Sequence, residues 1–426
     1  MIRNTLLLLV VVGLTASVTF SQTKQEFKAT YGAKENAERV ELAQDEEEFE
    51  AMFLKPIRFA TFNVSLNRKR EGQLVEDLQR DNFQAADIAE IIQRVRPEVL
   101  LLNEFDYDPK GKALTNFVTH YLGVSQGNEE PIEYAFNYSA PVNTGVPSGM
   151  DLNNNGKTTD PADAFGYGEF PGQYGMVVLS QLPLDRKNIR TFQKFLWKDM
   201  PGADLPIDQN AKKPYYSDEV MQKFRLSSKS HWDIPVLLGN RRIHFLVCHP
   251  TPPAFDGPED RNGCRNHDEI RFWADYIDPA KSGYIYDDKG RRGGLKKNEM
   301  FVIAGDLNAD PLDGGSRDGA IQQLLQHTLV KDTLPRNETG RLQSQKDGKA
   351  NLKHKGLPVF DTANFSDRVV GNLRADYVLP SFKVERSGIF WPKPGEPGSE
   401  LIGASDHRLV WIAFKIKTCM IQKHGL

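Results

Sequence analysis

The stretch FVIAGDLNADP, residues 301–311, constrains the fold most, because a short apolar run stops at a glycine and is followed at once by acid and amide side chains. The apolar residues 301–304 predict a buried strand, Gly305 lets the backbone turn or approach another group closely, and the final proline prevents the strand from continuing. Asp306 and Asn308 then stand two residues apart at the carboxyl end of that strand. A carboxylate can hold a hard cation or orient a water, and an amide can donate to a phosphate oxygen. The alternative is a polar turn after a core strand, since turns also favour Asp, Asn and Gly.

Other predicted strands also end or begin at a polar side chain. Their runs lie at residues 57–64, 99–102, 242–248, 376–380 and 408–414, and a further buried strand is predicted at 174–180. The polar side chains at the strand termini are Asn63, Glu104, His249, Asp306, Asn308, Asp376, Asp406 and His407. Turn residues placed by chance would scatter among Ser, Gly, Lys and Asp, whereas this set combines oxygen ligands, imidazoles and amides. A lone buried Asn or His is more often structural, so the set as a whole, and not one member, predicts a site.

Helical spacing between two of these strands indicates a sheet packed by helices. Apolar residues recur with helical periodicity at Ile88, Ile91, Ile92 and Val95, between the strands at 57–64 and 99–102. A second helix is expected to begin near Asn266 and Glu269, with a buried face formed by Ile270, Trp273 and Ile277. Residues 332–356 are charged and weakly patterned, which predicts an exposed loop.

A long insertion is predicted at about residues 123–175, which are rich in Gly, Asn, Pro and Tyr. Residues 151–163 within it place oxygen side chains at loop positions one, three and five and glycine at six, as at the start of an EF-hand-like calcium loop. Position twelve is an alanine, which departs from that pattern. The expected structural Ca²⁺ ligands are Asp151, Asn153, Asn155, Asp160 and Asp163. An Asn-rich surface loop without metal is the alternative.

The N-terminal residues predict export. Residues 1–21 carry Arg3, an apolar run at 6–12 and small residues before Gln22, which is typical of a secretory signal peptide and too short for a membrane span of about 20 residues. The expected localisation is therefore secreted or periplasmic, with no transmembrane segment in the mature chain; an uncleaved anchor is the alternative. Residues 22–55 form a polar, acidic lead-in, 56–416 a single domain, and 417–426 a tail.

Charge and cysteine content exclude several classes of protein. The net charge of -3 and the isoelectric point near 6.3 give no global basic field of the kind that drives sequence-independent nucleic-acid binding. Net charge therefore does not favour a nucleic acid as the partner, and a local patch near Arg241, Arg242, Arg261 and Arg265 is the alternative that would serve one. The three cysteines, Cys248, Cys264 and Cys419, are too few for a disulfide scaffold or a zinc ribbon, and a bridge between Cys248 and Cys264 is left open.

The strand-end motifs carry a family resemblance. They are TFN at 61–63, LNE at 102–104, His249 before a proline-rich loop, GDLN at 305–308, DYV at 376–378 and SDH at 405–407. In these residues the chain resembles the endonuclease/exonuclease/phosphatase family, the DNase I-like metal-dependent phosphoesterases, of secreted bacterial type, over about residues 57–414. The resemblance implies an α+β fold, a four-layer α/β/β/α sandwich of two mixed sheets packed face to face with helices outside. The insertion and the proline-rich loop depart from the family, so the resemblance does not carry over a substrate.

The resemblance also implies roles for the site residues. Glu104, with Asp406 and Asn63, would hold Mg²⁺ or Mn²⁺, and Asp306 would orient or deprotonate the attacking water. His407, oriented by Asp376, and His249 would donate to phosphate oxygens, while Asn308, Asn63 and His249 would bind the substrate. The expected function is hydrolysis of a phosphodiester or phosphomonoester by in-line attack of an activated water, by a monomer. The alternatives are an extracellular nuclease on the same site and a non-catalytic calcium-stabilised binding protein, and the residues leave open which group is the base.

Overall fold

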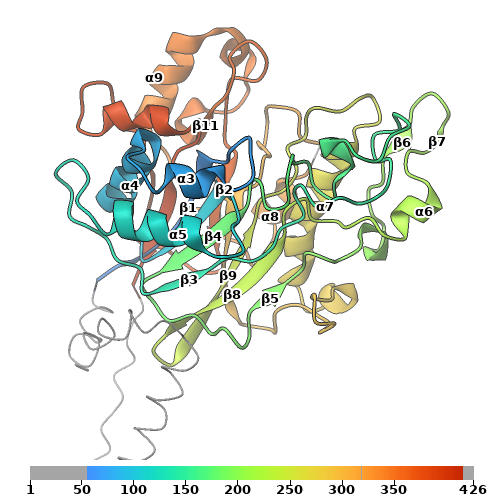
Figure 1. Cartoon of the computed structure of the whole chain (residues 1–426), viewed down its shortest axis with the longest axis horizontal. Helices are drawn as coiled ribbons and strands as arrows, with labels where there is room; N and C mark the ends of the chain where they lie inside the picture. The colour runs from blue at the N-terminus through green and yellow to red at the C-terminus, as the bar shows by residue number, and fades with distance from the viewer. Residues whose placement is uncertain (1–54, 318, 416–426) are drawn as a thin grey trace, which may run out of the picture. The chain divides into compact units, whose positions relative to one another are not determined.

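Most strands of the computed structural model, which describes residues 55–317 and 319–415, belong to two mixed sheets (Figure 1). The first sheet has the order β14 (Arg386–Ile389), β15 (Val410–Phe414), β1 (Ile57–Leu66), β2 (Val99–Phe105), β4 (Met176–Ser180) and β3 (Phe136–Tyr138). The second has the order β13 (Asp376–Pro380), β10 (Met300–Asp306), β9 (Arg241–Cys248), β8 (His231–Leu238) and β5 (Arg190–Thr191). In each sheet one pair is parallel, β1 with β2 and β9 with β10, and the other pairs are antiparallel.

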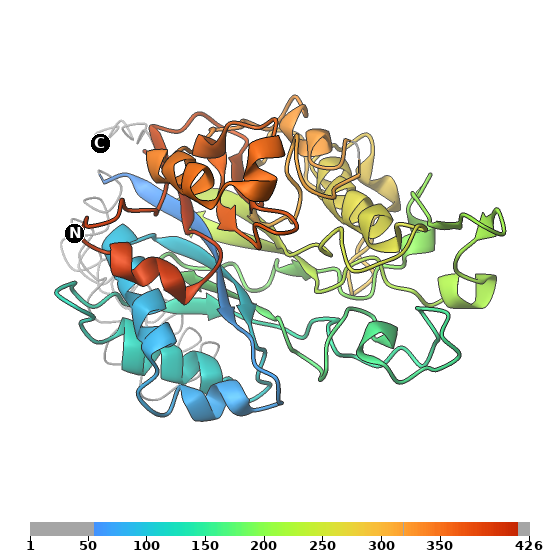
Figure 2. The ribbon, with the colours of Figure 1, turned by 90° about the horizontal axis from the view of Figure 1, so that it is seen from above.

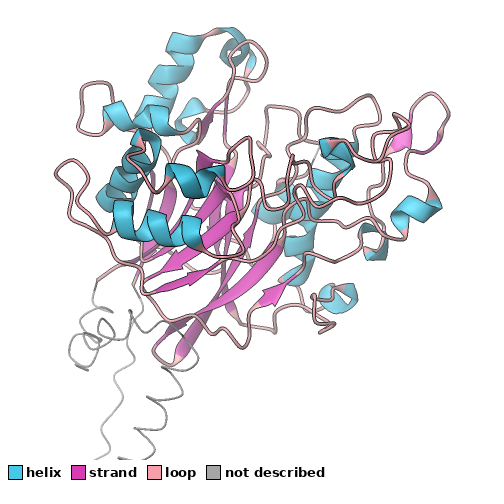
Figure 3. Cartoon of the chain, in the orientation of Figure 1, coloured by secondary structure: helices cyan, strands magenta, loops and turns pink. Residues whose placement is uncertain are grey.

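Helices cover the outer faces of the two sheets (Figure 2). The α-helices of the described residues are α3 (Gln73–Asp77), α4 (Phe83–Val95), α5 (Lys112–Phe117), α6 (Asp218–Met221), α7 (Arg261–Tyr276), α8 (Gln322–Leu325) and α9 (Glu338–Asp347). One apolar core joins α4 and α5 to the first sheet, and a second joins α7 and α8 to the second sheet. Two short hairpins complete the strands, β6 (Ile207–Asp208) with β7 (Lys213–Pro214) and β11 (Ala363–Asn364) with β12 (Asn372–Leu373). Strands lie at the centre and helices around them (Figure 3), which confirms the predicted fold class.

Strand alternation decides which side chains lie between the sheets. Ala60, Phe62 and Val64 of β1 pack in the core shared with α4, so the intervening residues face the second sheet. Phe59 is one of them, and its ring centroid lies 5.3 Å from that of Phe245 in β9. The following inward positions on β1 are Thr61 and Asn63. Alternation therefore carries polar side chains into the space between the sheets as β1 approaches its carboxyl end.

A glycine allows the close approach of β9 and β10 at that same edge. A Cβ atom built on Gly305 would lie 2.0 Å from the carbonyl oxygen of Cys248, closer than any real contact. Any larger residue would push the two parallel strands apart just before Asp306. The glycine that ends the apolar run in the sequence thus sets the spacing of the strand ends.

Two sequence predictions of local structure are wrong. The helix expected to start near Asn266 begins at Arg261, so both Asn266 and Glu269 are buried within α7. The segment predicted as an insertion contains β3, an edge strand of the first sheet. The exposed loop expected at 332–356 contains α9, whose buried residues include the small or polar Thr339, Gly340 and Ser344. Such a face has no hydrophobic periodicity, which is why the pattern did not indicate a helix.

Several sequence predictions concern residues beyond those described. The signal peptide at 1–21, most of the lead-in at 22–55, the tail at 417–426 and Cys419 lie outside the described residues. Cys248 and Cys264 are both buried and free, so no bridge joins them. Within residues 55–317 and 319–415, no helix is long and apolar enough to cross a membrane. Pro56–Lys415 groups as one compact unit.

Candidate active site

The carboxylate of Asp306 lies where the ends of both sheets meet. Its Oδ2 atom accepts a hydrogen bond of 3.0 Å from the side-chain amide of Asn63. The same oxygen lies 3.4 Å from Nε2 of His249 and 3.6 Å from Nε2 of His407. The four side chains are all buried. Three nitrogen-bearing groups from separate strand ends therefore converge on one oxygen atom.

Alternation along the strands explains this convergence. Phe301 and Ile303 of β10 pack in the core shared with α7, so Asp306, reached three residues after Ile303, points between the sheets. His249 follows the outward Cys248 of β9 and faces inward for the same reason. Asn103 of β2 ties the sheets together here, because its Oδ1 accepts the backbone N–H of Asp306 at 3.3 Å.

Glu104 turns toward the site because its backbone leaves the strand conformation. Its φ of 58° is in the left-handed region, which a non-glycine residue adopts rarely and which is common at functional sites. The carboxylate accepts hydrogen bonds from the amides of Asn63 at 3.1 Å and Asn67 at 2.7 Å. Burial raises the pKa of Glu104 above its ordinary value, and the Asn63 hydrogen bond opposes that rise. A carboxylate held like this gains from a nearby cation.

His407 is held by a buried carboxylate. Its Nδ1 lies 2.8 Å from Oδ2 of Asp376, which also accepts a 2.8 Å hydrogen bond from the hydroxyl of Thr362. Burial by itself lowers the pKa of His407, but the carboxylates of Asp376 and Asp306 outweigh burial and raise the pKa to about 10. The imidazole is therefore a cation at neutral pH, with Nδ1–H bound to Asp376 and Nε2–H directed at the site.

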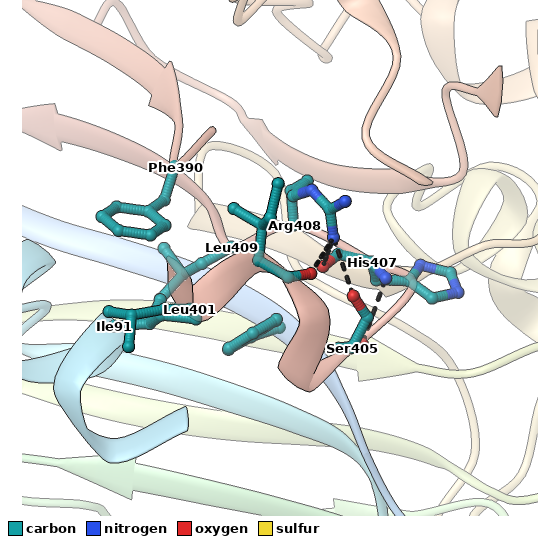
Figure 4. Close-up of a pocket in the computed structure, with 9 residues that line it drawn as sticks. Ile91, Phe390, Leu401, Ser405, His407, Arg408 and Leu409 are labelled. Carbon is teal, nitrogen blue, oxygen red and sulfur yellow. Dashed lines mark hydrogen bonds between the residues drawn. The ribbon is translucent and has the colours of Figure 1, made fainter. Parts of the chain in front are cut away.

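The segment that carries His407 is anchored on the other side by apolar packing (Figure 4). Leu401, Leu409 and Phe390 line a small closed pocket, and the His407 ring points away from them. The hydroxyl of Ser405 accepts the backbone N–H of His407 at 3.1 Å and donates to the carbonyl of Asn63 at 2.7 Å. The serine of the SDH motif thus joins the His407 segment to the end of β1.

His249 has the opposite electrostatic character. Burial, with the positive charges of Lys229 and His407, holds the pKa of His249 well below its ordinary value. Its Nδ1 atom is buried and has no hydrogen-bond partner among the described residues. The two imidazoles beside Asp306 are therefore a neutral one and a cationic one.

Two predicted site residues lie at the margin of this cluster. Asn308 donates its backbone N–H to Oδ1 of Asp306 at 3.0 Å, and its side-chain amide donates to the carbonyl of Pro250 at 3.2 Å. Asp406 is exposed, and its carboxylate accepts a hydrogen bond from Ser65 at 3.1 Å. The structure thus groups Asn63, Glu104, His249, Asp306, Asp376 and His407, with Asn308 and Asp406 beside them.

Lys229 is a site residue that sequence reasoning missed. It is 6% exposed and precedes β8, whose antiparallel pairing with β9 puts its start beside His249. Burial lowers the pKa of Lys229, while the charges of Glu269, Glu104 and Asp306 act to raise it. The strand at 231–238 was not predicted from the sequence, so nothing indicated that Lys229 lies at the end of a strand. Recognition of β8 would have placed Lys229 at the same sheet edge as the other strand ends.

The donor set suits a divalent cation. Two groups of side chains among the described residues place their ligand atoms within 4.8 Å of one another, Glu104 with His249 and Asp306, and Asp306 with Asp376 and His407. The second group contains the cationic His407, so it does not favour a further cation. The first group combines the central Asp306 with Glu104, whose pKa is raised by burial. Carboxylate oxygens of this kind are the ligands that Mg²⁺ and Mn²⁺ prefer. The residues present therefore fit a metal at Glu104.

In the predicted calcium loop, two carboxylates accept hydrogen bonds from the backbone N–H groups of the loop itself. Asp151 accepts the N–H groups of Asn155 at 3.1 Å and Gly156 at 2.8 Å. Asp163 accepts those of Leu152 at 2.9 Å and Asp160 at 3.0 Å. The loop is not one of the two clusters of acidic and imidazole ligand atoms found among the described residues.

The arginines expected to form a basic patch do not gather. Arg241 and Arg242 begin β9, at the end opposite to His249, and Arg242 pairs with Asp185. Arg265 is buried and donates to the carbonyl oxygens of residues 165, 225 and 226, and Arg261 pairs with Glu259. These four residues therefore do not form the local patch that the nuclease alternative would use.

The Asp376 and His407 pair predicts a pH-dependent contribution to stability. Because the folded-state pKa of His407 lies above its ordinary value of 6.5, the contribution is complete below pH 6.5 and is lost as the pH rises through about 10. Asp376→Asn should therefore lower the free energy of unfolding of the metal-free protein by about 3 kcal/mol near pH 6. Urea unfolding should show that the difference from the parent shrinks toward pH 10.

Asp361→Asn is the control for that measurement. Burial, with Asp310 and Asp313 nearby, raises the pKa of Asp361 to about 8, so ionisation of Asp361 disfavours the folded state. Its replacement should not destabilise the protein as the pH rises. A pH-independent loss in the Asp376 variant would show that the ion pair is not the cause.

Comparison with known families identifies one family. The sequence model of the endonuclease/exonuclease/phosphatase family matches residues 60–407. An endonuclease/exonuclease/phosphatase from Beutenbergia cavernae DSM 12333 is 16% identical, with a TM-score of 0.46 over 85% of this chain and 72% of that chain. Sphingomyelinase C from Streptomyces griseocarneus is 13% identical, with a TM-score of 0.45 over 84% and 99%. Truncated TDP2 from Caenorhabditis elegans is 13% identical, with a TM-score of 0.41 over 85% and 98%. No curated protein matches the chain.

Proposed function

The chain belongs to the endonuclease/exonuclease/phosphatase family, whose enzymes hydrolyse phosphoester bonds with divalent metal ions. We propose that it is a secreted phosphoesterase. It would cleave a phosphodiester or phosphomonoester by in-line attack of an activated water. The observation that carries the proposal is the position of Asp306, whose Oδ2 lies within 3.6 Å of nitrogen atoms from Asn63, His249 and His407. This arrangement puts a proton acceptor beside donors for an anionic substrate.

Asp306 serves as the base. Burial raises its pKa above the ordinary value, which makes the carboxylate a better proton acceptor, while the positive charge of His407 keeps it ionised at neutral pH. Its other oxygen is held by the backbone N–H of Asn308, so the carboxylate has a fixed orientation. As the water oxygen bonds to phosphorus, its proton passes to Asp306 and the bond to the leaving oxygen breaks.

Cationic donors stabilise the charge that develops on the phosphate oxygens. His407 is charged and held by Asp376, so its Nε2–H is available without reorganisation. Lys229 is buried near Glu104 and Asp306, whose negative charges act to raise its pKa against the lowering by burial. His249 stays neutral and contributes a hydrogen bond, with no need to release a proton. Asn63 orients both Glu104 and Asp306 through one side-chain amide.

Glu104 is the principal ligand for Mg²⁺ or Mn²⁺, with Asn63 and Asp406 as further candidate ligands. A bound divalent ion would neutralise negative charge on the phosphate and stabilise the leaving oxygen. Glu104 has its carboxylate fixed by Asn63 and Asn67, which favours a ligand of defined orientation.

Metal titration tests the role of Glu104. In Glu104→Gln the concentration of Mg²⁺ that gives half-maximal hydrolysis of bis-p-nitrophenyl phosphate should rise at least about tenfold, because a charged ligand is lost. Glu98→Gln is the control, since Glu98 is also half-buried with a raised pKa but precedes the opposite end of β2. An unchanged midpoint in the Glu104 variant would remove Glu104 from the metal site.

The loop at 151–163 is proposed to hold a structural Ca²⁺ that takes no part in the reaction. The order of its oxygen side chains supports the proposal, and a bound ion would stabilise the fold by mass action. Addition of calcium should raise the melting temperature of the parent. The melting temperature of the Asp151→Ala variant should be the same with and without calcium. Asp208→Ala should retain the rise, because Asp208 also binds loop N–H groups but lies in the β6–β7 turn. A rise that persists in Asp151→Ala would exclude this loop as the site.

A further inference from the structure

A lobe formed by residues 349–371 adjoins the catalytic imidazole. Its hairpin strand β11 meets His407 in an antiparallel bridge at Ala363, and the backbone N–H of Asn364 donates to the carbonyl of Asp406 at 2.7 Å. The ring of Phe365 packs edge-on against His407 with centroids 5.1 Å apart. Figure 1 shows β11 and α9 beyond the ends of the central strands. The lobe therefore stands at the sheet edge where the active site lies.

Apolar side chains project from this lobe into solvent. Leu352 is 78% exposed, Leu357 is 65% exposed and Val369 is 77% exposed. The turn that bears Val369 packs on the short helix η6 (Lys349–Lys353), since the backbone N–H of Ala350 donates to the carbonyl of Asp367 at 3.2 Å. Exposed aliphatic side chains gathered on one structured lobe indicate an interaction surface.

The apolar surface extends to the loop that follows β10. The carboxylate of Asp313 accepts the backbone N–H groups of Lys355 and Gly356, both at 2.8 Å. Leu312, the neighbour of Asp313, is 59% exposed. Exposed aliphatic residues are thus presented both by the lobe and by the loop that continues from Asp306.

All the exposed charged side chains of the lobe are basic. They are Lys349, Lys353, Lys355 and Arg368, and none forms an ion pair within the described part of the chain. The two acidic residues of the lobe are not exposed: Asp361 is buried, and Asp367 accepts a 3.4 Å hydrogen bond from Asn351. A net charge of -3 for the whole chain makes this local excess of positive charge the more distinctive.

We propose that the lobe at 349–371 docks on an anionic phospholipid surface and thereby delivers a membrane-embedded phosphoester to the active site. This inference rests on the proposed function. Basic side chains are attracted to anionic headgroups, and aliphatic side chains gain by entering the interface. A nucleic acid would match the charge but not the leucines and valine, since single strands are bound by stacking on aromatic rings. Within the lobe, the ring of Phe365 already packs against His407, and Phe360 is partly buried.

Vesicle binding by the full chain tests the proposal without requiring turnover. The parent should sediment with phosphatidylcholine vesicles that contain phosphatidylglycerol and far less with phosphatidylcholine alone. The triple variant K349Q/K353Q/K355Q should bind the anionic vesicles at least about tenfold more weakly, because each lysine contributes to attraction by the surface. The pair L352S/L357S should weaken binding as well, with its charges intact.

The matched control is K289Q/K296Q/K297Q. These three lysines are also exposed, and Lys296 and Lys297 precede the start of β10, at the end opposite to Asp306. This variant should bind vesicles like the parent. Loss of binding equal to that of the lobe variant would show a general charge effect and overturn the proposal.

Two further readouts separate this proposal from the proposed function. All the lobe variants should hydrolyse soluble bis-p-nitrophenyl phosphate at the parent rate. A parent that does not hydrolyse this substrate would contradict the proposed phosphoesterase activity, whereas the lobe proposal would still be tested by vesicle binding. A parent that fails to bind anionic vesicles, or a lobe variant that loses affinity for an oligonucleotide and not for vesicles, would overturn the lipid surface as the partner.

Discussion

The close approach of Asp306 to nitrogen atoms from both sheets is the interaction on which the site depends. A carboxylate buried between two sheets is costly unless it is hydrogen-bonded and paired with positive charge. Asn63 supplies the hydrogen bond and His407 supplies the charge, and both come from the sheet that does not contain Asp306. The contacts that satisfy Asp306 therefore also fix the ends of the two sheets against each other.

The balance of charge in this cluster bears on the proposed binding of a metal ion and an anionic substrate. Glu104, Asp306 and Asp376 bring three carboxylates, whereas His407 brings a cation with a raised pKa and Lys229 brings an amine whose pKa is lowered by burial. In the proposed function, a divalent cation at Glu104 would offset negative charge in the cluster and thereby favour an anionic substrate. Graded pKa values in neighbouring groups are typical of sites that hold and move protons.

Much of this arrangement follows from the sequence, because strand alternation is a local property. The inward positions of β1 and β10 can be read from the apolar residues that precede Asn63 and Asp306, and glycine at 305 marks the close approach of β9. The antiparallel β13 begins at that edge, so Asp376 pairs directly with Asp306. The sequence thus placed these residues at strand ends, and the pairing of the strands brought them together.

Other parts depend on contacts that no local pattern encodes. Glu104 reaches the site through a left-handed backbone conformation, and Lys229 reaches it because the serine-rich segment before β8 is buried. The helix α9 has a packing face of small and polar residues, and α7 begins earlier than its capping pattern suggested because Asn266 and Glu269 bond to loops beside the site. Tertiary contacts decided each of these cases.

The central claim is that Asp306 and His407 act on one transition state, and a double-mutant cycle of initial rates tests it most directly. At saturating Mg²⁺, Asp306→Asn and His407→Gln should each lower kcat by a factor on the order of 10² or more with a smaller effect on KM. The double variant should lose much less than the product of the two factors, because the two groups serve the same step. Near-parental kcat in a His407→Gln protein that keeps the parent melting temperature would contradict the account.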